Sequence, residues 1–468
     1  MPERNGSGSG LLVGPGSGAA ATAGLPKAAV RSKETGLKHK KKIFFGWWTV
    51  LATGILSGLG HGYYGYGFSV FFKDLAAELG LTRAVTALAA GVGKPAGDFS
   101  SPLVGWLADR YGPKFIIFFG VCLAGAGLIL MNFIATTAQY LVVWGVFVGM
   151  GLNIGLTVAV DKSLADWFVL KRGLAQGTKF ALIGVGGLTA LPVVTLLVTH
   201  FGWRTTCLIW GCLLLSLSPL ALVFVHQRRP EHYGLLPDGA DAPEKTIDPP
   251  LTAPNDGSRV DYQVQETEFT FKQAVRTRSY WLLAAAFTIQ MMIMGGVGIH
   301  VIPFLTDIGL DRARASAMMG LLVFFTIPSQ FFSGIAADRL GKKYQNLLSV
   351  AVYSMQCAGL AVLVLNRGPA SVYVFLVLYG FASGAATPLF ILILARYFGR
   401  KAFGSIFGGS MIIRAPASML APVFSGWIYD RTGNYRLAFT VFACLALTAA
   451  AIMALVRPVA PAQKETAG

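Results

Sequence analysis

Six charged side chains lie inside long apolar stretches of this 468-residue sequence. Placing an ionised group in such an interior costs at least about 2.5 kcal/mol, so each of them is a candidate functional group. A site with more cations than acids attracts anions, because opposite unit charges about 4 Å apart gain about 4 kcal/mol at an effective dielectric constant of about 20. Four of the six are basic and two are acidic: Lys94, Lys162, Lys179 and Arg414, against Asp98 and Asp161.

Arg414 is the strongest candidate for binding an anion. It lies 11 residues inside the apolar stretch 403–427, which is roughly 16 Å deep in a helix that rises about 1.5 Å per residue. A guanidinium stays protonated, and its planar fork matches a carboxylate through two parallel hydrogen bonds. The alternative is a structural role, in which Arg414 binds carbonyl groups of neighbouring helices.

Lys94 and Asp98 lie four residues apart and therefore share one face of a helix. In one interpretation the two side chains neutralise each other as a buried ion pair. In the other, an approaching anion draws Lys94 away and leaves Asp98 desolvated, which suits Asp98 to carry a proton. The predicted anion site requires that acids of the protein do not neutralise both Lys94 and Arg414.

Asp161 and Lys179 lie on either side of a short loop, so we expect an ion pair between neighbouring helices. In one interpretation this pair only joins the two helices, and in the other it is a cytoplasmic gate. Other polar side chains in the apolar stretches could add hydrogen bonds to a substrate. Packing, or a place at the membrane interface, would explain each of them as well. These additional candidates are Asn153, Tyr64, Gln290 and His300.

The stretches that must position these groups are long enough to cross a membrane. Hydrophobic residues make up 54% of the chain and charged residues 13%, with a mean hydropathy of +0.59, which excludes a soluble protein of this size. We predict an all-α polytopic membrane protein with twelve transmembrane helices in two pseudo-symmetric six-helix bundles. The expected spans are 44–71, 84–107, 115–136, 139–165, 173–199, 204–226, 279–305, 314–337, 345–366, 371–395, 403–427 and 435–457.

Polar segments divide the chain into regions. We expect a disordered basic tail at 1–42, a first bundle at 43–226, a hydrophilic connector at 227–278, a second bundle at 279–457 and a C-terminal tail at 458–468. The net charge is +17, and many of the basic residues lie in the first tail and the connector, which favours membrane lipids over nucleic acid as the partner. The positive-inside rule places both termini and the connector in the cytoplasm, and we expect the plasma (inner) membrane.

The two halves are copies of each other. Gly105-Trp-Leu-Ala-Asp-Arg-Tyr-Gly112 recurs in the second half as Gly334-Ile-Ala-Ala-Asp-Arg-Leu-Gly341, and the same displacement along the chain relates Lys171-Arg172 to Arg400-Lys401. A slightly larger displacement relates Trp203-Arg204 to Tyr435-Arg436. Parallel repeats of this kind imply a pseudo-two-fold axis along the membrane normal and a substrate site between the halves near the middle of the membrane.

These motifs give residues 44–457 a resemblance to the major facilitator superfamily, whose most specific mark is the Gly-x-x-x-Asp-Arg-x-Gly loop. Phe45-Gly46-Trp47-Trp48, Gly202-Trp203-Arg204 and the segment 229–239 resemble the monocarboxylate transporter family, including the oxalate/formate exchangers. The carboxylate of Asp109 can pair with basic loop residues or with the N-terminus of a neighbouring helix. The resemblance implies a latch that holds the outward-open state, and the latch residues are Asp109, Arg110, Asp338 and Arg339.

The sequence also departs from the monocarboxylate transporters. Where these transporters typically carry an Asp and an Arg four residues apart, this chain has Thr326 and Gln330, and their lysine in the first span is absent. In the oxalate/formate exchangers a lysine occupies a place similar to that of Arg414. The departures therefore indicate that a lactate-type proton mechanism does not carry over to this chain, and we expect the basic role to have moved to Lys94 and Arg414.

The sequence lacks the signatures of an enzyme, an ATP site or a metal site, so we expect no cofactor and no metal. We predict a secondary active transporter of small organic anions, mono- or dicarboxylates, that works by alternating access and is driven by protons or a counter-substrate. Arg414 would bind the carboxylate, Lys94 would assist and Asp98 would carry the proton. Two alternatives stay open: a carrier of amphipathic organic compounds in which the charges are merely paired, and a non-transporting membrane receptor or sensor.

Overall fold

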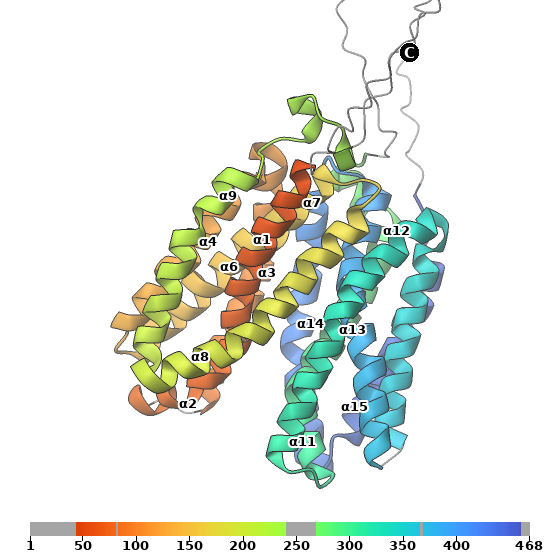
Figure 1. Cartoon of the computed structure of the whole chain (residues 1–468). Coiled ribbons are helices and arrows are strands. Elements are labelled where there is room, and N and C mark those ends of the chain that lie inside the picture. Colours follow the sequence, from red (N-terminus) through yellow and green to blue (C-terminus); the bar gives the residue numbers. More distant parts are fainter. Residues whose placement is uncertain (1–43, 81–82, 240–267, 366–367, 460–468) are drawn as a thin grey trace, which may run out of the picture. The chain divides into compact units, whose positions relative to one another are not determined.

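The computed structural model describes residues 44–80, 83–239, 268–365 and 368–459, and every regular element in these ranges is a helix (Figure 1). These described residues all belong to one compact unit. The expected tail at 1–42, residues 240–267 of the connector and nearly all of the C-terminal tail lie outside the described residues. So do some helical side chains, including those of 83–96, and with them the side chain of Lys94.

Six membrane-crossing segments precede the connector. The first segment combines α1, a π-helical turn and the start of α2. A helix needs roughly 20 residues to cross a bilayer, and residues 45–71 exceed that length. α8 contains two spans, because Gly202 adopts a φ of +76° that reverses the chain tightly. The bounds are α1 (Phe45–Gly62), η1 (Tyr63–Gly67), α2 (Phe68–Glu78), α3 (Arg83–Tyr111), α4 (Pro113–Leu130), η2 (Met131–Phe133), α5 (Thr137–Tyr140), η3 (Leu141–Met150), α6 (Gly151–Asn153), η4 (Ile154–Val158), α7 (Ala159–Trp167), α8 (Arg172–Leu217) and α9 (Pro219–Phe224).

Six further segments follow the connector. α12 contains two spans, Ala317–Leu340 and Tyr344–Leu365. Three short helices belong to the connector: η5 (Pro230–Tyr233), η6 (Pro237–Gly239) and α10 (Phe271–Val275). The long helices are α11 (Arg278–Asp307), α12 (Arg312–Leu365), α13 (Pro369–Phe398), α14 (Phe403–Thr432) and α15 (Arg436–Leu455).

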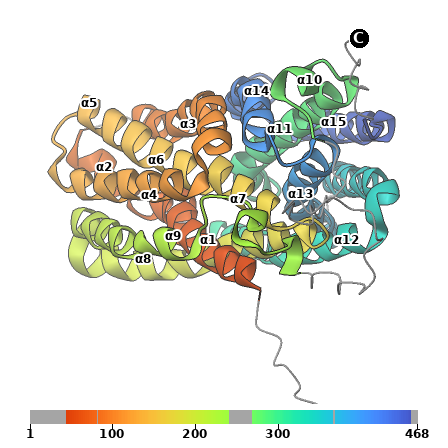
Figure 2. The ribbon, with the colours of Figure 1, turned by 90° about the horizontal axis from the view of Figure 1, so that it is seen from above.

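The helices confirm the predicted all-α fold with twelve spans. Nine helical stretches of the described residues are apolar and long enough to cross a membrane by composition and length alone. One of them, Arg172–Phe224, holds the two spans separated by Gly202, and the first span and α3 complete the twelve. Seen from above, the helices before the connector and those after it form two groups, which are called the N-terminal and C-terminal halves below (Figure 2).

The internal repeat is visible in equivalent contacts at the end of the helices opposite to the connector, called the far end below. Arg204 donates from Nη1 to the carbonyl oxygen of Asn132 at 2.7 Å. In the C-terminal half, Arg436 donates from Nη2 to the carbonyl oxygen of Val364 at 2.8 Å. The two acceptors are separated along the chain by the same interval as the two donors. The repeated aromatic-arginine motif therefore forms the same hydrogen bond, from an arginine side chain to a backbone carbonyl oxygen, in each half.

Glycines let the helices within a half approach closely. A Cβ at Gly58 of α1 would lie 2.8 Å from the carbonyl oxygen of Leu182 in α8, and a Cβ at Gly151 would lie 2.7 Å from the backbone nitrogen of Ala124 in α4. Small residues are the usual means of helix packing in membranes, where lipid tails are as apolar as leucine side chains.

Candidate functional site

A buried ion pair joins the two halves. Asp98 of α3 is completely buried and accepts a hydrogen bond on Oδ1 from Nη2 of Arg414, which lies in α14 and is 7% exposed. Both residues lie well inside their helices, several turns from either end. The pair therefore links the N-terminal half to the C-terminal half at the depth where the sequence predicts the substrate site.

Polar and aromatic side chains surround this pair. Asn153 lies with its Nδ2 3.5 Å from Asp98 Oδ1, and its own Oδ1 accepts a hydrogen bond of 3.1 Å from Ser101 Oγ. The guanidinium carbon of Arg414 lies 5.5 Å from the ring centre of Phe287, a geometry that favours a cation. Phe287 is in turn stacked on Phe390, with ring centres 3.9 Å apart.

Two polar atoms of the pair make no hydrogen bond to any described residue. They are Asp98 Oδ2 and Arg414 Nε, and both are buried. A carboxylate oxygen of this kind can take up a proton, and an N–H group of this kind can bind an acceptor on a ligand. The pair therefore has one free position for a proton and one for an anion.

This arrangement corrects one sequence-based expectation. Arg414 is not an uncompensated cation in this state, because its partner is Asp98. The predicted pair of Lys94 and Asp98 within one helix lies outside the described residues and stays a prediction. The partner that the spacing did not indicate is Arg414, whose guanidinium reaches the carboxylate of Asp98 from α14 in the other half. Lys94 remains a predicted ligand, since its side chain lies outside the description.

The other predicted substrate ligands lie at different distances from the pair. Asn153 contacts Asp98 of the pair. It lies between two π-helical segments of the fourth span, and π-helical segments often occur at functional sites. Gln290 is fully buried three residues after Phe287 on α11, and neither of its amide atoms has a hydrogen-bond partner among the described residues. Residues three apart share one helix face, so Gln290 follows Phe287 along the side that Arg414 contacts.

Tyr64 and His300 lie in other surroundings. Tyr64 stacks on Trp144 within the N-terminal half, with ring centres 5.1 Å apart. His300 has its Nε2 3.0 Å from the carbonyl oxygen of Pro422 and packs against Tyr435. The structure therefore gives both residues packing partners and does not bring either of them to Arg414.

Two latches join the halves at the end that carries the connector, called the connector end below. In the first latch, Asp109 at the end of α3 accepts hydrogen bonds from the backbone N–H groups of Gly404 and Ser405 at the start of α14, at 3.0 and 2.7 Å. Ser405 Oγ donates a third bond, at 2.7 Å. A helix N-terminus presents unpaired N–H groups and partial positive charge, so a carboxylate is well placed there.

The second latch is the copy of the first with the halves exchanged. Asp338 in α12 accepts hydrogen bonds from the backbone N–H groups of Gly173 and Leu174 at the start of α8, at 2.9 and 2.7 Å. Arg396 of α13 adds an ion pair to Asp338 at 2.6 Å. The sequence indicated the acid but not Arg396, which no repeated motif marks.

The basic partners of the Asp-Arg motifs do not take part in the latches. Arg110 is exposed and lies over the rings of Trp106 and Tyr111, at 5.3 and 5.5 Å from their centres. Arg339 is also exposed. At these motifs, the aspartates make the hydrogen bonds between the halves that the described residues show, and the gating role stays a prediction.

The predicted pair of Asp161 and Lys179 is present and buried. Lys179 Nζ lies 2.5 Å from Asp161 Oδ1, and the two side chains are 2% and 1% exposed. It joins α7 to α8 within one half, so it differs from the latches, which join different halves.

A further ionic network at the connector end was not expected from the sequence. Lys162 donates to Asp166 at 2.8 Å and to the carbonyl oxygen of Arg400 at 2.5 Å, and it lies 3.5 Å from Asp109. Arg400 reaches back to the carbonyl oxygen of Asp166 and to Glu231 of the connector, at 2.8 and 2.7 Å. Residues of α3 and α7, of the loop before α14 and of the connector thus pair at one place.

The connector is also tied to the start of α8. Asp238 accepts hydrogen bonds from three consecutive backbone N–H groups, those of Val169, Leu170 and Lys171, at 2.8 to 3.0 Å. Its φ is +62°, the only positive value of a non-glycine residue among the described residues. An aspartate tolerates this conformation better than most residues, because its short side chain can bond locally.

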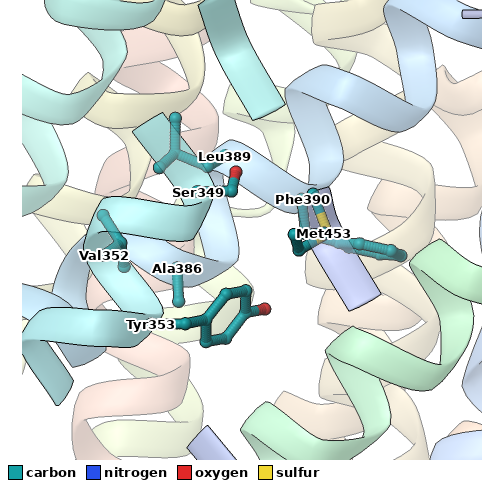
Figure 3. Close-up of a pocket in the computed structure, with 7 residues that line it drawn as sticks. All are labelled: Ser349, Val352, Tyr353, Ala386, Leu389, Phe390 and Met453. Atoms are coloured by element: carbon teal, nitrogen blue, oxygen red, sulfur yellow. The ribbon is translucent and has the colours of Figure 1, made fainter. Parts of the chain in front are cut away.

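A small cavity lies in the core of the C-terminal half. Among the residues described, no three His, Cys, Asp or Glu side chains gather closely enough to hold a metal. A cavity between α12, α13 and α15 is lined by Ser349, Tyr353, Phe390 and others and measures about 10 Å³ (Figure 3). That volume suits about one water molecule and no larger ligand.

Comparisons with known proteins agree with this architecture. The family model described as the Major Facilitator Superfamily matches residues 51–417. Monocarboxylate transporter 12-B of Danio rerio is 26% identical over 351 residues, which cover 72% of each chain. Monocarboxylate transporter 4 of Rattus norvegicus is 24% identical over 416 residues, which cover 88% of this chain and 83% of the relative.

Solved structures show the same fold at low sequence identity. The fucose:proton symporter of E. coli superposes with a TM-score of 0.63 at 13% identity and covers 89% of this chain and 98% of its own. A human organic anion transporter (TETRAN) superposes with a TM-score of 0.63 at 13% identity and covers 87% of this chain and 98% of its own.

Proposed function

Because the chain belongs to the Major Facilitator Superfamily and is a secondary transporter rather than an enzyme, we propose that its cargo is a small organic anion, a mono- or dicarboxylate. The observation that carries this proposal is the buried pair of Asp98 and Arg414 between the two halves. Arg414 is the binding group for the carboxylate, and its Nε is already without a partner among the described residues. Asn153, Gln290 and Lys94 are the further ligands that we assign to the same site.

Asp98 couples transport to protons in this proposal. While Asp98 is ionised, it holds Arg414 and no carboxylate can bind there. When a proton binds to Oδ2, the attraction between the two side chains falls, and Arg414 is free to bind the carboxylate of the cargo. The pair of Asp98 and Arg414 carries no net charge before binding. When a proton enters together with a monocarboxylate, the net charge at the pair stays zero. Burial strongly favours such a charge-neutral exchange, because an uncompensated charge in this interior is costly.

The latches give the proposal its conformational part. Two aspartates hold the halves together at the connector end, so rocking of the N-terminal half against the C-terminal half must break both sets of hydrogen bonds. We place the connector end in the cytoplasm of the plasma (inner) membrane, since basic residues gather there. In this orientation the described state is closed toward the cytoplasm, and release of the latches opens it.

The names of the relatives support a carboxylate cargo. Several relatives that align with most of this chain are called monocarboxylate transporters. Their identity to this chain is 23 to 26%, a level at which the fold is kept while the chemistry of the cavity can change. Thr326 and Gln330 mark such a change, which is why the proposal rests on Arg414 and Asp98.

Uptake into proteoliposomes tests this proposal. The purified chain is given labelled formate, lactate, oxalate and succinate, with and without an inward proton gradient. We expect at least one carboxylate to accumulate, and the gradient to increase its uptake. Arg414→Gln should reduce this uptake by about 100-fold, since two charge-assisted hydrogen bonds are lost. Arg431→Gln is the matched control, because Arg431 lies exposed on the same helix. Equal uptake by the Arg414→Gln variant and the parent would refute the assignment.

A second candidate is favoured by the same pair. Because Arg414 is already neutralised by Asp98, the chain could carry amphipathic organic compounds that never break the ion pair. The two candidates differ in one result. An amphipathic cargo should be transported equally well by a double variant, Asp98→Asn with Arg414→Gln, whereas a carboxylate should not be transported by it.

A further inference from the structure

A second polar site lies at the connector end, away from the central pair. It is a cavity of about 580 Å³ between the end of α3, α7, the two described parts of the connector and the loop before α14. This size falls within the range of small-molecule sites in proteins. Five basic and three acidic side chains line it: Arg110, Lys162, Arg228, Arg229 and Lys401, with Asp109, Asp166 and Glu268.

The acids of this cavity are all occupied. Asp109 accepts the three hydrogen bonds of the first latch, Asp166 pairs with Lys162 at 2.8 Å, and Glu268 pairs with Arg229 at 2.7 Å. The three remaining cations, Arg110, Arg228 and Lys401, are exposed, and none of them pairs with an acid among the described residues. The lining as a whole carries an excess of two positive charges.

The three free cations come from both halves. Arg110 lies in the last turn of α3, Arg228 lies in the connector after α9, and Lys401 lies in the loop between α13 and α14. A single anion that contacts all three would therefore bridge the halves beside the first latch. Such a ligand would stabilise the state that is closed at the connector end, because an open connector end separates Lys401 from the two arginines.

We propose that this cavity binds a multiply charged phosphate group as an effector, separate from the transported cargo. Arginine suits phosphate, because its planar fork binds two oxygens at once, and two of the three free cations are arginines. Two or more negative charges match the excess of the lining. Trp106 and Tyr111, 44% and 54% exposed, flank Arg110, and such aromatic residues favour the level of the lipid headgroups. Both a soluble organic phosphate and a phospholipid headgroup can reach a site at this level.

Binding measurements on the full chain test the proposal and separate the two sources. In one arm, the chain sits in nanodiscs of neutral phosphatidylcholine and is titrated with sodium tripolyphosphate, followed by thermophoresis and thermal unfolding. In the other arm, the nanodiscs contain phosphatidic acid, and native mass spectrometry counts the lipids retained. We expect saturable binding in at least one arm and a raised unfolding temperature in the same arm. Absence of saturable binding in both arms would overturn the proposal.

Variants decide whether the bound phosphate occupies this cavity. Arg228→Gln removes a free cation from the connector and Lys401→Gln removes one from the C-terminal half, and each should weaken binding about tenfold. Both side chains are exposed, so the variants should unfold at the temperature of the parent. Arg457→Gln is the matched control, since Arg457 is an exposed arginine near the end of α15 that does not line the cavity. Equal weakening by Arg457→Gln, or no weakening by the other two, would show nonspecific attraction and overturn the proposal. The readout is binding and not uptake, so it is independent of the cargo proposed above.

Discussion

Asp109 and Asp338, which stand at equivalent positions of the two sequence repeats, make the same contact in opposite directions across the molecule. Each carboxylate accepts two backbone N–H groups at the start of a helix of the other half, Asp109 on α14 and Asp338 on α8. The two helix starts are themselves separated along the chain by nearly the same interval as the two aspartates. The two repeats thus form two reciprocal latches. Both latches must open for the halves to separate at the connector end.

Asp109→Asn should loosen the first latch. The amide keeps one acceptor oxygen but loses the charge, which weakens bonds to N–H groups by about 1 kcal/mol and raises the open population about fivefold. Hydrogen exchange of the amides at Gly404 and Ser405 measures this opening directly. Exchange there should become faster in the variant. Asp430→Asn, on an exposed acid of α14 at the far end, is the control and should leave it unchanged.

The latches also need glycine at the crossing of the helices. A Cβ on Gly105 would run into the carbonyl oxygen of Gly404, and a Cβ on Gly334 would run into that of Gly173. Gly105→Ala and Gly334→Ala should therefore push the halves apart, at a cost of about 1–3 kcal/mol each. We expect faster exchange at the start of α14 in the first variant and at the start of α8 in the second.

Gly298→Ala is the control for both glycine variants, because a Cβ there would meet nothing within 4 Å. It should leave exchange and uptake as in the parent. If Gly105→Ala and Gly334→Ala exchanged no faster than Gly298→Ala, the close approach at the latches would not hold the connector end closed.

Glu78 makes part of the stability of the far end depend on pH. Hydrogen bonds from Arg204, aided by Trp203, lower the pKa of Glu78 from its ordinary value of 4.5. A lowered pKa in the folded state gives a stabilisation that is present above pH 4.5 and is lost as the pH falls through the lower value. Glu78→Gln should therefore lower the unfolding temperature at neutral pH, and the difference from the parent should shrink below about pH 4.

Two comparisons check this assignment. Asp74→Asn changes an exposed acid of the same helix and should leave the unfolding temperature at neutral pH as in the parent. High salt should reduce the effect of Glu78→Gln, since the side chains of Glu78 and Arg204 are 45% and 29% exposed. The assignment would be wrong if the unfolding temperatures of Glu78→Gln and the parent differed by the same amount from neutral to strongly acidic pH.

The fold was predictable because hydropathy and repetition are strong signals in a membrane protein. Every backbone polar group in a bilayer must be satisfied within its own helix, so each apolar stretch of about 20 residues reports one span. The acid of each latch was also predictable, since Asp109 and Asp338 stand at equivalent places of a repeated loop. The bonding to a helix N-terminus follows from the exposed N–H groups that every helix start presents.

The partner of Asp98 was harder to predict. Spacing within a sequence reports neighbours on the same helix, such as Lys94, whereas Arg414 reaches Asp98 from a helix of the other half, far away along the chain. The same limit applies to Arg396, which pairs with Asp338 of another helix, and to the contact of Lys162 with Asp109. Pairs between helices depend on which helices pack together and at which relative depth, whereas spacing along the sequence reports neighbours on one helix.

The pair of Asp98 and Arg414 gives a test in which stability and transport separate. Either Asp98→Asn or Arg414→Gln alone leaves one buried charge without its partner, which costs about 3–5 kcal/mol. The double variant leaves no charge at the pair and should regain most of that loss, so we expect a coupling free energy of about 3 kcal/mol in a double-mutant cycle of unfolding. Carboxylate uptake should nevertheless stay absent in the double variant, because its binding group is missing. Additive losses of stability would show that the two side chains do not depend on each other, and recovery of carboxylate uptake together with stability would show that the pair only holds the helices in place.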